Sequence, residues 1–113
     1  MTEIIINQVS EHCRISPHAL RTKDRHGNLV KARHLYCYFM REFTHLSLTE
    51  IGEYINRDHA TIIHGWRSIK NQLESYGYFR KEIDPLEKRI SELIQFHTTA
   101  DEEVFQQNDF FTN

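Results

Sequence analysis

The sequence predicts an all-α fold in a single compact domain, and three observations indicate it. The chain has 113 residues, within the range of about 100 to 200 that is typical of one domain. Apolar residues recur every three or four positions along most of the chain, which is the spacing of amphipathic helices. Ser47 with Glu50, and Asp84-Pro85 with Glu87, have the spacing of helix-capping sequences.

Two helices are expected at the start of the chain. Residues 2–14 place Ile5, Val9 and Cys13 on one helical face. Ser16-Pro17 then has the residue types of an N-cap and a first helical position, so a short second helix is expected to follow.

A polar loop and a central helix are predicted next. The loop covers residues 23–28 and contains Gly27. The six apolar residues Leu35–Met40 could form a buried strand, but they belong to a longer helical pattern that continues to Phe43 and Leu46. A central helix over about residues 30–44 is therefore the favoured interpretation.

Two further helices, joined by a tight turn, are predicted at residues 47–56 and 58–74. Ser47 and Asp58 are the expected caps. The second helix has an apolar stripe and an opposite polar stripe; these are Ile62, Trp66, Ile69 and Leu73 against Ala60, His64, Arg67 and Asn71. This order of elements is a helix-turn-helix.

The chain is expected to end in one more helix and a tail. Asp84-Pro85 begins this helix, which carries apolar residues at helical spacing and ends at about His97. The apolar face of residues 83–93 could pack on the protein's own core or form a dimer seam. The resulting division is a helix-turn-helix domain (1–78), a C-terminal helix packed on or beside it (79–97) and a flexible acidic tail (98–113).

Composition indicates a soluble globular protein without a membrane segment. The apolar run Ile4–Ile6 is too short for a signal peptide, and no stretch approaches the roughly 20 residues of a membrane span. Cys13 and Cys37 are expected to be free buried thiols in a reducing cytoplasm, with a disulfide as the alternative.

Charge is distributed unevenly along the chain. The formal net charge is −2, which argues weakly against a polyanionic partner. Residues 1–80 carry 11 basic and 8 acidic residues, a net of +3, whereas residues 81–113 carry 3 basic and 8 acidic residues, a net of −5. The first part is therefore mildly basic and the last part acidic.

The polar residues that begin the helix at 58–74 allow three kinds of site. His59 and His64 are five residues apart, on different faces, so a zinc pair is not expected. A catalytic acid/base pair is not expected either, because Asp58 and His59 are adjacent and do not face each other. The glycines are isolated, so they form no phosphate-binding loop. We therefore expect no catalytic residue, no metal and no cofactor.

The third possibility is a surface that recognises another molecule. The second helix of a helix-turn-helix lies in the major groove, where its first residues meet base edges. His59, Ala60, His64 and Arg67 have the required position on the helix. The helical periodicity alone supports a DNA-recognition surface and an ordinary solvated helix face equally.

A specific resemblance favours DNA recognition. The segment EIGEYINRDHATIIHGWRSI strongly resembles the C-terminal DNA-binding domain of the bacterial replication initiator DnaA, and the resemblance covers roughly residues 3–75. The resemblance implies a Trp-repressor-like fold and contacts to duplex DNA. The implied base contacts are Arg25 in the minor groove and Asp58, His59, Ala60, Thr61 and Ile63 in the major groove. The implied phosphate contacts are Lys31, Arg33, His34, Arg41, His64 and Arg67.

This chain departs from the family pattern at three positions, one of which is an implied base contact. Ala60 stands where the family has Ser or Thr, so a methyl group remains for thymine but the hydroxyl is lost. Ser68 replaces a residue that is often basic, and Asp24 places an acid in a usually cationic loop. Fewer phosphate contacts predict weaker and less salt-sensitive binding.

Sequence-specific binding of double-stranded DNA is the predicted function, in a regulatory or accessory role in replication or transcription within the nucleoid. The alternative is an adaptor that binds replication proteins through its acidic C-terminal helix and tail. The tail residues Gln107, Asp109, Phe110 and Phe111 are similar to the short peptide that binds the replicative sliding clamp, although an unbound tail is favoured. The sequence does not fix the oligomeric state.

Overall fold

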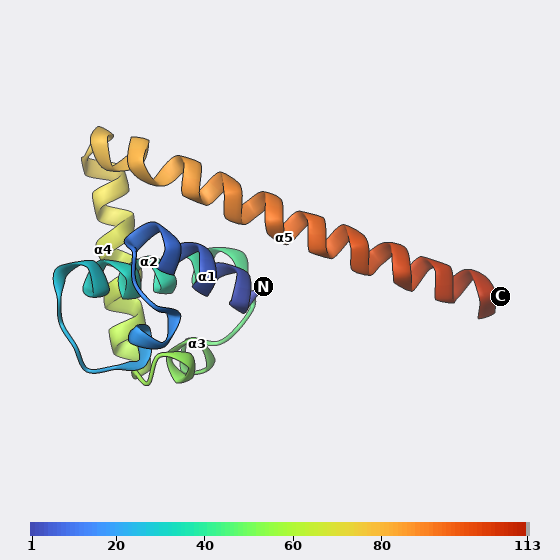
Figure 1. Ribbon diagram of the computed structural model, residues 1–113, viewed down its shortest axis with the longest axis horizontal. Coiled ribbons are helices and arrows are strands. Elements are labelled where there is room, and N and C mark those ends of the chain that lie inside the picture. The colour runs from blue at the N-terminus through green and yellow to red at the C-terminus, as the bar shows by residue number, and fades with distance from the viewer. Residues whose placement is uncertain (113) are drawn as a thin grey trace.

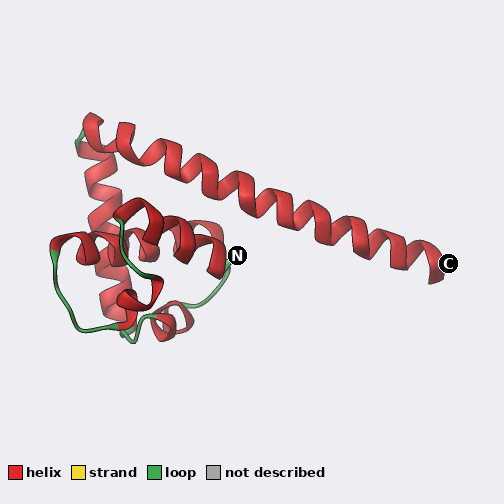
Figure 2. Cartoon of the chain, in the orientation of Figure 1, coloured by secondary structure: helices red, strands yellow, loops and turns green. Residues whose placement is uncertain are grey.

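Helices and connecting loops make up the computed structural model, which describes the backbone of residues 1–112 and the side chains of residues 1–97 (Figure 2). The elements are α1 (Thr2–Cys13), the 3-10 helix η1 (Pro17–Arg21), α2 (Gly27–Phe43), α3 (Leu48–Tyr54), α4 (His59–Ser75) and α5 (Gly77–Thr112). The predicted all-α fold is confirmed. Within this described part, no helix is both long and apolar enough to cross a membrane.

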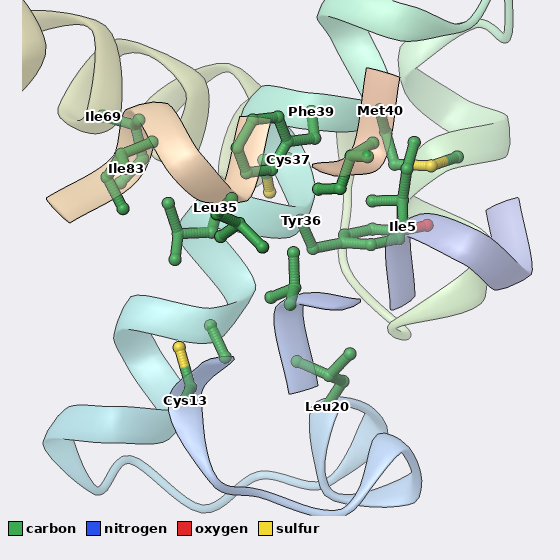
Figure 3. Packing of buried hydrophobic residues seen from close by; sticks show 14 of the residues in the cluster. Ile5, Cys13, Leu20, Leu35, Tyr36, Cys37, Phe39, Met40, Ile69 and Ile83 are labelled. Atoms are coloured by element: carbon green, nitrogen blue, oxygen red, sulfur yellow. The ribbon is translucent and has the colours of Figure 1, made fainter. Parts of the chain in front are cut away.

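The centre of the fold is α2. It contributes more buried residues than any other described helix, and α1 and α4 pack against it (Figure 1). Tyr36, Phe39 and Met40 are fully buried (Figure 3), and burying such a side chain contributes about 1.5–3 kcal/mol. The helical interpretation of the apolar run Leu35–Met40 is confirmed, because α2 contains the whole run. The Tyr36 hydroxyl also donates to the Ile51 carbonyl oxygen at 2.8 Å, which ties α2 to α3.

The predicted inner face of α1 is also confirmed. Ile5, Val9 and Cys13 are all buried. The helix ends at Arg14, which has a left-handed backbone (φ 58°, ψ 47°). The short second helix is present as the 3-10 helix η1, but the Ser16 side chain makes no capping hydrogen bond to it.

The turn between α3 and α4 depends on backbone geometry as well as on caps. Ser47 and Glu50 form the predicted capping box, with the Glu50 N–H donating to Ser47 Oγ at 3.1 Å. Asn56 has a positive φ of 55° in the turn. A Cβ atom at Gly52 would lie 2.2 Å from the Arg57 carbonyl oxygen, so only glycine fits there. The turn therefore closes tightly enough to set α4 directly after α3.

The start of α5 differs from the prediction. The helix begins at Gly77, so the predicted start at Asp84-Pro85 is wrong, and Pro85 lies inside the helix. Proline removes one backbone donor and disfavours this arrangement. Phe79 and Ile83, however, are four residues apart and both buried in the core. Their packing favours a helix through residues 77–84 over the local capping signal.

The first half of α5 packs on α1 and α4, and the second half extends away from the body of the molecule (Figure 1). Ile90 is fully buried and Ile94 partly buried, whereas Phe96 is 70% exposed. The helix continues to Thr112, although the sequence predicts a flexible tail from residue 98. The predicted division into residues 1–78, 79–97 and 98–113 stays a prediction.

Candidate nucleic-acid interface

The start of α4 and one of its faces are exposed to solvent, as the sequence predicts. The exposed residues of this face are Ala60, His64, Arg67 and Asn71. The buried residues of the opposite face are Ile62, Gly65, Ile69 and Leu73. Of the other predicted base-contacting residues on α4, His59 and Thr61 are exposed and Ile63 is partly buried. The helix therefore joins an apolar anchoring face to a polar face that is open to a partner.

Asp58 is the N-cap of α4, as predicted. Its Oδ1 accepts hydrogen bonds from the Thr61 backbone N–H at 2.9 Å and from the Thr61 hydroxyl at 2.7 Å. These bonds lower the pKa of Asp58, because they stabilise the ionised carboxylate. The capping bonds fix Asp58 and Thr61 relative to each other before any ligand arrives.

A basic depression lies beside this helix start. Its volume is about 630 Å³, and its walls come from the loop before α2, from α2 itself, from the α3–α4 turn and from α4. The lining residues are Lys23, Arg25, Val30, Arg33, His34, Cys37, Ile55, Asn56, Arg57, Thr61 and His64. Every charged side chain among them is basic. The depression therefore offers a positive local potential in a chain of negative net charge.

Arg33 does not have the exposure that a phosphate contact requires. The residue is only 7% exposed. Its guanidinium donates to the backbone carbonyls of Leu20 at 3.0 Å, Ala19 at 3.2 Å, and Thr22 and Asp24 at 2.5 Å each. Burial, followed by the nearby charge of Arg57, lowers the pKa of Arg33. This geometry argues against the predicted phosphate contact; instead, Arg33 fixes the loop that follows η1.

Arg57 has a related structural role that the sequence did not indicate. Its guanidinium donates to the carbonyl of Thr22 at 2.7 Å and to that of Ile55 at 2.8 Å. Arg33 and Arg57 thus share the Thr22 carbonyl as an acceptor. Two arginines from different helical units hold the loop against the helix-turn-helix. The loop and the start of α4 are therefore set at a fixed spacing.

Arg25, the predicted minor-groove contact, lies exposed on this loop at the edge of the depression. The neighbouring acid, Asp24, accepts hydrogen bonds from the backbone N–H of His26 at 3.1 Å and from its ring Nδ1 at 2.5 Å. These two bonds lower the pKa of Asp24. The acid that departs from the family pattern is therefore engaged locally just before α2 and does not pair with Arg25.

His34 and His64 face each other across α2 and α4. Their ring centroids are 5.6 Å apart in an edge-to-face arrangement. His34 is partly buried, and its pKa is lowered first by desolvation and then by His64. His34 is therefore neutral near pH 7 and can offer a phosphate a hydrogen bond but no full charge.

The remaining predicted phosphate contacts differ in their surroundings. Lys31 is partly buried, and its Nζ lies 2.6 Å from a carboxylate oxygen of Glu82. Arg67 is exposed on α4. Arg41 is exposed at the end of α2, and its guanidinium carbon lies 4.0 Å from the centre of the Trp66 ring. Arg41 and Arg67 are thus the more accessible of these charges.

Metal or thiol chemistry has little support in this region. Among the described residues, no three His, Cys, Asp or Glu side chains are grouped to hold a metal ion. Cys37 borders the depression, but burial raises its pKa to about 12, so it is a neutral thiol near pH 7. The depression and its surroundings offer hydrogen bonds and positive charge.

Comparison with known proteins places this architecture in a family. Residues 2–69 match the family described as bacterial DnaA protein helix-turn-helix. The chromosomal replication initiator protein DnaA of Herpetosiphon aurantiacus is 39% identical over 87 residues, which cover 76% of this chain and 18% of that protein. The DnaA of Lachnoclostridium phytofermentans is 36% identical over 90 residues, 79% of this chain and 20% of that protein. This chain thus spans about a fifth of these relatives' length, and it belongs to the bacterial DnaA helix-turn-helix family.

Proposed function

We propose that the protein binds double-stranded DNA in a sequence-specific manner, with α4 in the major groove. The observation that carries the proposal is the open polar face of α4 next to a depression whose charged residues are all basic. A helix with its side chains is about 10–12 Å across, which fits a major groove about 12 Å wide. Family membership supports the same function.

Base selection is assigned to the first turns of α4 and to Arg25. His59 is exposed at the first position of the helix, and Asp58 and Thr61 are held beside it by the capping bonds. Ala60 is exposed and offers a methyl group, which suits contact with the methyl group of thymine. Ile63 adds apolar surface on the His59 side of the helix. Arg25 is assigned to the adjacent minor groove, and its exposure at the edge of the depression supports this assignment.

Affinity is assigned to the basic residues around this helix. Lys31, His34, Arg41, His64 and Arg67 keep their proposed contacts to phosphates, and Arg33 is given a supporting role instead. Phosphate contacts position a protein on the duplex but carry no sequence information.

The proposed biological role is in DNA replication or its regulation. The relatives are chromosomal replication initiator proteins, so a related site on DNA is the natural target. Location on the bacterial nucleoid follows from this role.

Two variants separate selectivity from affinity. His59→Ala is expected to bring the affinities for selected and random duplexes closer together, because a base contact is lost. Arg67→Ala is expected to weaken binding to all duplexes alike and to reduce the slope of log K against log salt by about 0.9. Fluorescence anisotropy titrations on duplexes selected from a random pool measure both effects. Unchanged binding in both variants would refute the placement of α4 in the groove.

A second candidate function is an adaptor for replication proteins. The projecting half of α5 and the 70% exposure of Phe96 favour it, because both leave surface open to a partner. The proposed clamp-binding residues, Gln107, Asp109, Phe110 and Phe111, lie outside the described side chains. A pulldown with purified bacterial sliding clamp tests the peptide. Capture that persists after deletion of residues 105–113 would exclude it.

A further inference from the structure

A cationic cluster surrounds Trp66 on the side of α4 away from the basic depression. The guanidinium carbon of Arg41 lies 4.0 Å from the centre of the indole ring, and Nζ of Lys70 lies 4.7 Å from it. The indole Nε1–H donates to Glu42 Oε1 at 3.1 Å. Arg41 and Lys70 are both exposed. One aromatic ring thus gathers two cations from different helices.

The position of this cluster follows from the helical repeat. At about 100° per residue, His59, Ile63, Trp66 and Lys70 lie within a stripe about 60° wide along α4. Thr61 and His64, which line the basic depression, lie on the other side of the exposed face. The cluster and the depression therefore flank the exposed face of α4 on its two sides.

A helix in the major groove has a phosphate backbone on each side. The depression supplies positive charge to one side only. We propose that Trp66 holds Arg41 and Lys70 as a pair of cations for the phosphates on the other side. Lys70 is then a DNA contact and Trp66 a positioning residue. This inference rests on the proposed binding of duplex DNA.

The cluster is suited to this task because both cations lie over the indole ring and neither forms a salt bridge with another described side chain. Long basic side chains lose conformational freedom when they bind, and holding them in place beforehand reduces that loss. Cations stack favourably on indole within about 6 Å of its centre. Among the described residues, neither Arg41 nor Lys70 forms a salt bridge with a carboxylate. Glu42 instead accepts the indole N–H and so orients the ring.

Salt-dependent anisotropy titrations of a random duplex test the proposal. Arg41→Ala and Lys70→Ala are each expected to reduce the slope of log K against log salt by about 0.9. Trp66→Leu is expected to weaken binding about threefold to tenfold while both cations remain in the chain. In the background of Arg41→Ala with Lys70→Ala, Trp66→Leu is expected to have little further effect. Trp66→Phe keeps an aromatic face and should bind nearly as wild type does.

The control variants are matched in charge and in exposure but lie on a different helix. Lys88→Ala and Arg89→Ala remove the same charges from exposed positions of α5 and should leave the slope unchanged. Trp66 is the only tryptophan of the chain, so its quenching by iodide reports on the cluster directly. Iodide is an anion, so quenching should fall in the Arg41→Ala and Lys70→Ala variants, and it should fall in wild type when duplex is added.

The outcomes separate this inference from the proposed function. If wild type binds no duplex, the proposed function fails. If wild type binds but Lys70→Ala leaves the slope unchanged and duplex does not protect Trp66 from iodide, the cluster does not contact DNA. If Trp66→Leu does not fold, the slopes of Arg41→Ala and Lys70→Ala and the binding of Trp66→Phe still decide the question.

Discussion

At the scale of single residues, Gly52 of α3 has the strictest steric requirement among the glycines of the chain. A Cβ atom there would lie 2.2 Å from the backbone oxygen of Arg57, whereas one at Gly77 would meet nothing within 4 Å. Gly52→Ala is therefore expected to lower the free energy of unfolding by about 3 kcal/mol. Gly77→Ala should raise it by up to about 1 kcal/mol, because alanine favours a helix. Urea denaturation measures both; equal stabilities would contradict the close approach at Gly52.

Arg33 is expected to affect stability more than the salt dependence of DNA binding. Arg33→Ala leaves several backbone carbonyls without a donor, so a loss of about 2–4 kcal/mol is expected. Arg67→Ala, at an exposed position, should change stability by less than about 0.5 kcal/mol. In denaturation, Arg33→Ala should lower stability and Arg67→Ala should not. In salt titrations of DNA binding, Arg67→Ala should reduce the slope and Arg33→Ala should change it little. A normal stability of Arg33→Ala together with a reduced salt slope would restore the phosphate contact predicted from the sequence.

These residues also show what could be predicted from the sequence at this scale. The caps Ser47 and Asp58 could be predicted because a cap and its partner lie within three residues of each other. The role of Arg33 could not be predicted, because its partners are backbone carbonyls from residues 19–24. Main-chain atoms leave no signature in the sequence, and only the folded loop brings them together. The role of Arg57 could not be predicted for the same reason, because its partners are also backbone carbonyls.

At the scale of elements, Glu82 joins α5 to two other helices. Its Oε2 lies 2.8 Å from His12 Nε2 of α1 and 2.6 Å from Lys31 Nζ of α2. Partial burial raises the pKa of Glu82, but the hydrogen bonds from Lys31 and His12 outweigh burial, and the net shift is downward. The ionised carboxylate is thus favoured in the folded state and helps to hold α5 in place.

The pH dependence of this contact follows from the sign of the shift. A carboxylate with a lowered pKa stabilises the fold above its ordinary pKa of 4.5, and this stabilisation is lost as pH falls through its folded-state value. Glu82→Gln should lower the free energy of unfolding at pH 7 by at most about 1 kcal/mol, because both side chains of the pair are more than a third exposed and water screens their attraction. The difference in free energy of unfolding between wild type and Glu82→Gln should vanish well below pH 4.5, as denaturation curves at several pH values would show. A difference that persists there would mean that Glu82 acts without its charge.

The boundaries of α5 illustrate the limit of prediction for elements. The helices that carry clear periodicity, α1, α2 and α4, were predicted with small errors at their ends. Asp84-Pro85-x-Glu87 has every local feature of a helix start, yet the helix begins at Gly77. Burial of Phe79 and Ile83 against the core decides the outcome. Local sequence cannot report a contact between residues far apart in the chain.

At the scale of the whole molecule, charge is divided between two regions. The body carries the basic depression and the Trp66 cluster, whereas residues 98–113 carry four acidic and no basic residues. A negative net charge is therefore compatible with DNA binding if the two regions lie apart when the duplex is bound. The extension of α5 away from the body is consistent with such a separation (Figure 1).

Removal of residues 98–113 tests this view of the molecule. Truncation after His97 changes the formal net charge from −2 to +2 and leaves all buried residues of the described core in place. The free energy of unfolding should stay unchanged. Duplex affinity should rise about twofold to tenfold at about 50 mM salt and less at about 200 mM, because salt screens the repulsion between the acidic segment and phosphates. A full-length variant with Asn or Gln at the four acidic positions should behave in the same way, since length is not the cause. Loss of affinity in both proteins would instead mean that the acidic side chains belong to the DNA-binding surface. Loss of affinity in the truncated protein alone would mean that DNA binding needs the length of α5 and not its acidic charge.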